Sequence, residues 1–64
     1  MPRLPAVSAV VCNYNGERYL EDCLRALLAQ GADEVLVVDD ASTDGSVALV
    51  RERFPGVEVL VLAR

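Results

Sequence analysis

Two short polar segments contain the side chains best suited to binding a ligand. In the first, Tyr14 lies between two amide residues, Asn13 and Asn15. An aromatic ring beside amides can stack on a flat base and form hydrogen bonds with its edge. The second segment begins with the adjacent acids Asp39 and Asp40. Neighbouring carboxylates repel each other unless a cation or hydrogen-bond donors stabilise their charges. Together these residue types favour recognition of a nucleoside.

A pyrimidine is the base that such carboxylates can distinguish. Uracil presents one N–H donor between two carbonyl acceptors, whereas N3 of cytosine is an acceptor. A carboxylate of Asp39 or Asp40 can therefore accept the uracil N–H and reject cytosine, and the other carboxylate can bind the ribose hydroxyls. The following residues are ordinary turn and cap types, and we interpret them in that way: Ser42, Thr43, Asp44 and Gly45.

The elements that position these segments follow from the apolar pattern. Continuous apolar runs predict strands over 7–12, 34–39 and 57–62, of a kind that is covered on both faces. Apolar residues at helical spacing predict helices over 17–30 and 46–54. Strand–helix–strand units of this size form parallel sheets with right-handed connections. Both polar segments then emerge at the carboxyl edge of the sheet, where ligands of such folds bind.

Local signals place the helix ends and the two cysteines. Asn15 is a candidate N-cap of the first helix, Thr43 or Asp44 is one of the second, and Gly31 supplies a left-handed stop. Cys12 and Cys23 match neither a zinc nor a redox spacing, so we expect both to be small core residues. A thiol beside the ligand segment is the alternative for Cys12.

Composition limits the function classes. The 64 residues allow at most one small domain, and a net charge of −4 without a basic cluster argues against nucleic acid as a partner. Neither a spanning apolar run nor a signal peptide is present, so we expect a cytoplasmic segment. The first turn has no G-x-G-x-x-G, which argues against a dinucleotide site.

The two segments, at this spacing, resemble the N-terminus of family 2 glycosyltransferases. The matching stretches are Val10–Gly16 and Val37–Ser46, separated by a leucine-rich helix that ends near Gln30. The second stretch is the more specific, and the resemblance covers about Val7 to Arg64. It implies a three-layer, Rossmann-like β-α-β-α-β arrangement with parallel strands, the N-terminal part of a GT-A fold.

The resemblance also implies a reaction and its ligands. Family members transfer a sugar, by an inverting displacement of hexosyltransferase type, from a nucleotide-diphosphate sugar with UDP or dTDP to a saccharide or lipid-linked acceptor. The resemblance also implies cell-envelope polysaccharide biosynthesis, with acceptors at the inner membrane face. The resemblance implies five nucleotide-binding residues: Cys12, Asn13, Tyr14, Asp39 and Asp40. Of the two acids, Asp40 is slightly favoured for the base, and Cys12 stands where many relatives have Thr or Pro.

The resemblance implies further residues that this sequence lacks. Relatives use a divalent metal, Mg or Mn, bound by a later Asp-x-Asp motif, and a later acid deprotonates the acceptor. Neither motif occurs in residues 1–64, which we interpret as a single partial domain that is catalytically silent and contains no metal ligands. The alternatives are a phosphoacceptor, receiver-like signalling domain and a non-catalytic truncated product.

Overall fold

Strands and helices alternate along the chain and form one parallel sheet. The computed structural model describes residues 7–63, and its elements follow in the order β1 (Ser8–Asn13), α1 (Glu17–Ala29), β2 (Glu34–Asp39), α2 (Ser46–Arg53) and β3 (Glu58–Val61). The predicted β-α-β-α-β arrangement with parallel strands is therefore confirmed, and each observed boundary lies within one residue of the predicted one.

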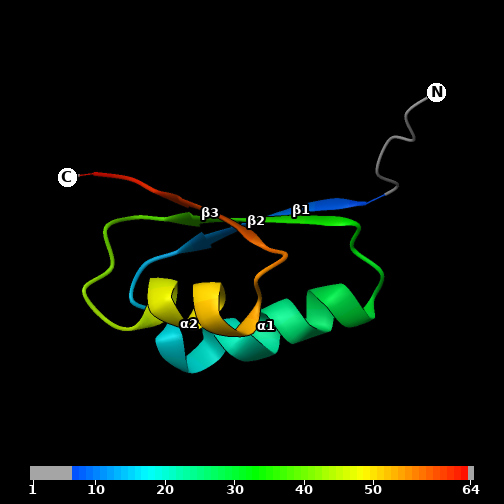
Figure 1. The fold of residues 1–64 in the computed structure, drawn as a ribbon, viewed down its shortest axis with the longest axis horizontal. Coiled ribbons are helices and arrows are strands. Elements are labelled where there is room, and N and C mark those ends of the chain that lie inside the picture. The colour runs from blue at the N-terminus through cyan, green and yellow to red at the C-terminus, as the bar shows by residue number, and fades with distance from the viewer. Residues whose placement is uncertain (1–6, 64) are drawn as a thin grey trace.

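The sheet has β2 in its centre, and both helices cover the same face of it (Figure 1). β1 pairs with β2 from Ser8↔Glu34 to Asn13↔Asp39, and β2 pairs with β3 from Leu36↔Glu58 to Asp39↔Val61. Right-handed connections between successive neighbours place every crossover helix on one side. Of the three layers that the resemblance implies, residues 7–63 form two, the sheet and one helix layer.

The hydrophobic core lies between these two layers. Because successive strand residues point to opposite faces, every second residue of β2 reaches the helices. Val35 and Val37 do so, and they contact Leu20 and Leu24 of α1 and Val50 of α2. Phe54 and Val57 complete the buried cluster at the end of α2.

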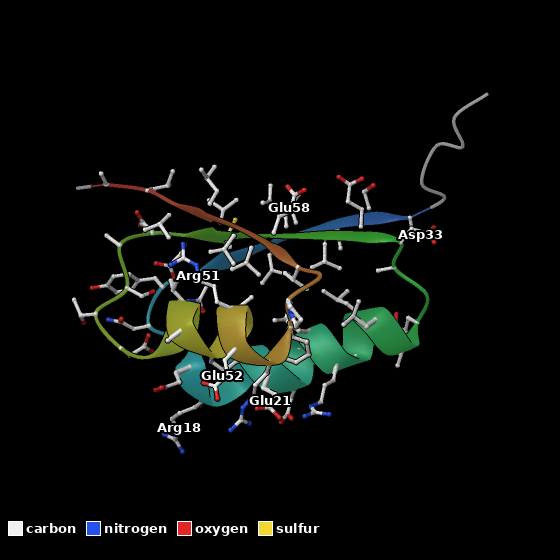
Figure 2. The ribbon with its side chains drawn as sticks, viewed as in Figure 1. Arg18, Glu21, Asp33, Arg51, Glu52 and Glu58 are labelled. Carbon is white, nitrogen blue, oxygen red and sulfur yellow. The ribbon has the colours of Figure 1, made fainter. Side chains whose placement is uncertain are left out.

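The other face of the sheet is apolar and uncovered within residues 7–63. Val10 is 65% exposed and Leu60 51% exposed. Figure 2 shows Glu58 on this same side, away from the helices. The prediction of strands covered on both faces is therefore wrong for the described residues, because both helices pack on a single face.

The same geometry corrects the prediction that the two cysteines are core residues, since both are exposed. In β1, Ala9 and Val11 pack against the core. Because successive side chains of a strand point to opposite faces, Cys12 points to the uncovered face. On α1, the buried stripe consists of Leu20 and Leu24. A three-stranded sheet covers only a narrow part of a helix, and Cys23 lies beside that part.

A left-handed glycine ends α1, and the N-cap residues of the two helices, Gly16 and Gly45, form no side-chain cap hydrogen bond. Gly31, with φ of 89°, ends α1, and the N–H groups of Gly31 and Ala32 donate to the carbonyls of Leu28 and Leu27. On the solvent side, Glu21 pairs with Arg25 at 2.8 Å and also with Arg53 (Figure 2 labels Glu21).

No helix within residues 7–63 has the length and apolar character needed to cross a membrane.

Candidate functional site

The carboxyl ends of all three strands meet at one edge of the sheet. Asn13 and Asp39 are register partners, and the N–H of Asp40 donates to the carbonyl of Asn13 at 2.9 Å. On the other side of β2, the N–H of Leu62 donates to the carbonyl of Asp39 at 2.8 Å. These bonds extend the parallel pairing beyond β2 and β3, so the two polar segments emerge side by side, as the sequence predicted.

A pocket of about 350 Å³ opens at this edge. Its walls come from all three strand ends: Cys12, Asn13, Tyr14, Val38, Asp40 and Leu62. Four of the five predicted nucleotide-binding residues therefore lie together, and Asp39 is not among the lining residues. The volume lies within the range of small-molecule pockets. Tyr14 is 65% exposed and gives the pocket its aromatic side chain.

Val38 and Leu62 also line the pocket, and the sequence did not predict this role for either residue. Val38 is two residues from Asp40, and Val38 pairs with Leu60, two residues before Leu62. Residues two apart in a strand share a face. Val38 could therefore have been found from Asp40, since the two residues lie on the same face of the chain. Leu62 could not, because its place depends on the register of β3, which the sequence does not reveal.

Asp39 points away from the pocket, into the space between the sheet and the loops. Its side chain is only 1% exposed. One carboxylate oxygen accepts hydrogen bonds from Asn13 Nδ2 at 2.9 Å and from the Ser42 hydroxyl at 2.6 Å, and the other accepts from the Ser42 N–H at 2.9 Å. Burial raises the pKa of this carboxyl, but the bonds from Ser42 and Asn13 outweigh burial and hold the pKa below its ordinary value.

Hydrogen bonds join the two polar segments to each other. The Ser42 hydroxyl accepts from the N–H of Asn15 at 2.9 Å and from Asn13 Nδ2 at 3.3 Å. In return, Asn15 Oδ1 accepts from the N–H of Thr43 at 2.8 Å and of Asp44 at 3.3 Å. The prediction that Asn15 caps the first helix is wrong, because its side chain binds the backbone of the other segment.

The Asp44 carboxylate lies at the N-termini of both helices. One oxygen accepts from the N–H and hydroxyl of Ser46, which begins α2, although the N-cap position of this helix is Gly45 and not the predicted Thr43 or Asp44. The other accepts from the N–H of Glu17, which begins α1, at 3.1 Å. The bond from the Ser46 hydroxyl is the largest effect that lowers the pKa of Asp44. A negative charge at two helix N-termini is favourable for both helix dipoles.

Two residues beside the site have the left-handed backbone conformation. Asn15 has φ of 50° and Ala41 has φ of 57°. Asn adopts this conformation readily, whereas Ala does so at a cost of about 1–2 kcal/mol. The hydrogen bonds of Asp39 and Ser42, on either side of Asp40 and Ala41, hold the turn in this shape.

The described acids do not form a metal centre. Within residues 7–63, no group of three or more Asp, Glu, Cys or His side chains is arranged to hold an ion. Asp39 is committed to Ser42 and Asn13, and Asp40 lines the pocket on the opposite face. A divalent cation usually needs several oxygen ligands in one place. These residues therefore do not fit the divalent metal that the resemblance implies.

The fold and the pocket together define a class of protein. A parallel α/β sheet with a pocket at its carboxyl edge, lined by an aromatic ring and a carboxylate, is the arrangement of α/β proteins that bind small ligands beyond their strand ends. Comparison with known proteins gives the family. The family model described as Glycosyl transferase family 2 matches residues 8–64, so the chain belongs to glycosyltransferase family 2.

Individual relatives agree with this assignment. An uncharacterized glycosyltransferase of Haemophilus influenzae is 33% identical over 54 residues, which cover 81% of this chain and 17% of the relative. The lipopolysaccharide core biosynthesis glycosyltransferase LpsC of Rhizobium meliloti is 39% identical over 51 residues, 80% of this chain and 18% of the relative. An uncharacterized glycosyltransferase of Nostoc sp. is 43% identical over 54 residues, with 77% and 17% covered. The chain thus spans less than a fifth of the length of these relatives.

Proposed function

We propose that this chain is the nucleoside-binding segment of a glycosyltransferase that transfers a sugar from a nucleotide-diphosphate sugar to an acceptor hydroxyl. The observation that supports it is the convergence of Tyr14 and Asp40 in one pocket at the carboxyl edge of the sheet. The aromatic ring of Tyr14 stacks on the base, and the Asp40 carboxylate accepts the N3–H of uracil or thymine. Cys12 and Asn13 complete the wall of the pocket.

The remaining parts of the proposal concern chemistry outside residues 7–63. An inverting displacement of hexosyltransferase type requires stabilisation of the leaving diphosphate and a base for the acceptor. We assign the divalent metal, Mg or Mn, and that base to other residues, since the described acids do not fit a metal. The 64 residues alone are then catalytically silent. LpsC acts in lipopolysaccharide core biosynthesis, and a saccharide or lipid-linked acceptor at the inner membrane face, in the cytoplasm, is the matching proposal here.

A titration of the isotope-labelled chain with UDP, followed by amide chemical shifts, tests the binding claim. We expect shifts at Tyr14 and Asp40, and weaker binding of CDP by roughly tenfold, because the cytosine N3 has no proton for the carboxylate. dTDP, whose base has the same N3–H edge as uracil, should bind about as tightly as UDP and more tightly than CDP. The absence of shifts at these residues at millimolar UDP would remove the claim.

Replacement of the aromatic ring provides a matched pair of variants. Tyr14→Ala removes the stacking surface and should weaken UDP binding by about tenfold, since base stacking contributes about 1–3 kcal/mol. Tyr19→Ala removes a ring of similar exposure, 72%, on α1, outside the pocket. We expect the Tyr19 variant to bind UDP as the wild type does. Equal effects of the two variants would indicate that stacking on Tyr14 plays no part.

A further inference from the structure

The residues at the carboxyl edge fall into two sets that alternate along the chain. Tyr14 and Asp40 line the pocket. Their neighbours Asn13 and Asp39 are buried, with exposures of 7% and 1%, and their side chains bind each other and Ser42. Asn13 also contributes to the wall of the pocket, whereas Asp39 does not. Each pocket residue is therefore attached to a residue whose side chain is fixed by hydrogen bonds.

We propose that Asp39 and Ser42 are positioning residues, which hold Tyr14 and Asp40 in the geometry that binds the nucleoside, and that Asp39 itself does not touch the ligand. The inference rests on the proposed function. A carboxylate that is 1% exposed presents no surface to a ligand, and both of its oxygens already accept hydrogen bonds. The Ser42 hydroxyl donates to Asp39 and accepts from Asn15 and Asn13, so it joins both segments at one atom.

The positions of the hydrogen bonds explain how the geometry is transmitted. Ser42 contacts the residues on both sides of Tyr14, at Asn13 Nδ2 and the Asn15 N–H. It also closes the turn that contains Asp40 and the left-handed Ala41, through its N–H to Asp39. Loops that are fixed before binding lose less conformational entropy on binding, so they bind more tightly. Loss of these bonds should therefore weaken every nucleotide equally and leave the choice of base unchanged.

Affinities for UDP and CDP in a set of variants test this. In Asp39→Asn an N–H₂ group faces the Ser42 donors, and in Ser42→Ala the shared hydroxyl is lost. We expect both variants to bind UDP and CDP about fivefold more weakly, since one hydrogen bond contributes about 1 kcal/mol, with an unchanged UDP to CDP ratio. Ser42→Thr keeps the hydroxyl and should restore binding. Asp40→Asn should instead bring the ratio close to one.

Matched controls make the same substitutions on exposed positions outside the site, Asp22→Asn on α1 and Ser8→Ala at the start of β1. Both should bind as the wild type. If Asp39→Asn does not fold, as amide spectra would show, the Ser42 pair decides alone. A changed UDP to CDP ratio in Asp39→Asn would overturn the inference, because Asp39 would then contact the base. Wild-type affinity in folded Ser42→Ala would overturn it as well.

A measurement without ligand separates this inference from the proposed function. Backbone order parameters from ¹⁵N relaxation at Tyr14 and Asp40 should be about 0.8 or higher in the wild type and should fall in Ser42→Ala. If the wild type binds no UDP, the proposed function fails, and this measurement still tests whether Ser42 orders the segments. Unchanged order parameters in Ser42→Ala would show that it does not.

Discussion

The two faces of the sheet have different surroundings, although the same strands form both. On the helix-covered face, Val35 and Val37 are buried in the core, and the row ends in the hydrogen-bonded Asp39. On the uncovered face, exposed apolar residues such as Val10 lead to Asp40 and the pocket. Adjacent residues thus pack in the core on one face and lead to the pocket on the other, because strand side chains alternate.

This difference shows that two neighbouring acids need not share a role. The carboxylates of Asp39 and Asp40 belong to different faces, and only Asp40 lines the pocket. The fixed side chains of the covered face determine where the backbone of the pocket lies. Variants that act on one face and not the other can break or sharpen this comparison.

The largest difference is expected between Leu24→Ala and Leu60→Ala. Leu24 is fully buried on the covered side, and its truncation leaves a cavity that should lower the free energy of unfolding by about 3 kcal/mol. Leu60, on the uncovered face, is 51% exposed, and its truncation should cost below about 1 kcal/mol. Urea unfolding followed by circular dichroism measures both. Equal losses would show that the uncovered face is packed in solution.

Asp39→Asn should have the next largest effect on stability, and an effect that depends on pH. A carboxyl whose folded pKa lies below its unfolded value stabilises the fold above the unfolded pKa, and this contribution is lost as the pH falls through the folded pKa. The variant should therefore lose about 2 kcal/mol near neutral pH, where buried bonds to a charged group are broken. The difference from the wild type should shrink as the pH falls below the ordinary pKa of Asp and toward the lowered pKa of the folded state.

Urea midpoints at about pH 7 and about pH 2.5 check this prediction. The variant should retain part of the pH dependence, because the pKa values of Asp44 and Glu21 are also lowered, in the case of Glu21 mainly by the hydrogen bond from Arg25. Asp22→Asn, on the exposed side of α1, is the control and should follow the wild type. A constant difference between Asp39→Asn and the wild type at both pH values would contradict the argument.

A smaller effect of opposite sign is expected from Ala41→Gly. The left-handed conformation costs Ala about 1–2 kcal/mol, and the extra chain entropy of Gly removes about 0.5–1 kcal/mol of the gain, so the net stabilisation should be about 0.5–1 kcal/mol. Ala48→Gly makes the same change within α2, at an exposed position, and should destabilise by about 1 kcal/mol. Thermal unfolding compares the two variants. Destabilisation by both would show that Ala41 is not left-handed in solution.

The sequence predicted the arrangement that brings the site together, because that arrangement depends on period and order. Apolar runs and helical spacing were sufficient for the five elements, and the parallel order placed both polar segments at one edge. The pocket at the carboxyl ends follows from the same topology.

The roles of individual residues could not be predicted, because they depend on strand phase and on contacts across the two segments. Residues 35–38 are all apolar, so no alternation indicates which of Asp39 and Asp40 points inward. Asn15 has the type and place of a cap, but its partner lies in the other segment, 28 residues later at Thr43. The exposed position of Cys12 depends on how many faces of the sheet are covered, which one strand does not show.

The two cysteines offer the mildest test of the comparison between faces, since both are exposed and only Cys12 lines the pocket. UDP at about five times its Kd should slow alkylation of Cys12 by iodoacetamide by about sixfold, because only the unbound protein reacts. Cys23, on α1, should react at an unchanged rate. Trypsin separates the two thiols at Arg18, so mass spectrometry can follow both in one sample. Equal slowing of both thiols would indicate a general change of the fold, whereas selective slowing of Cys12 would place the nucleoside on the uncovered face, at the end where Asp40 and Tyr14 converge.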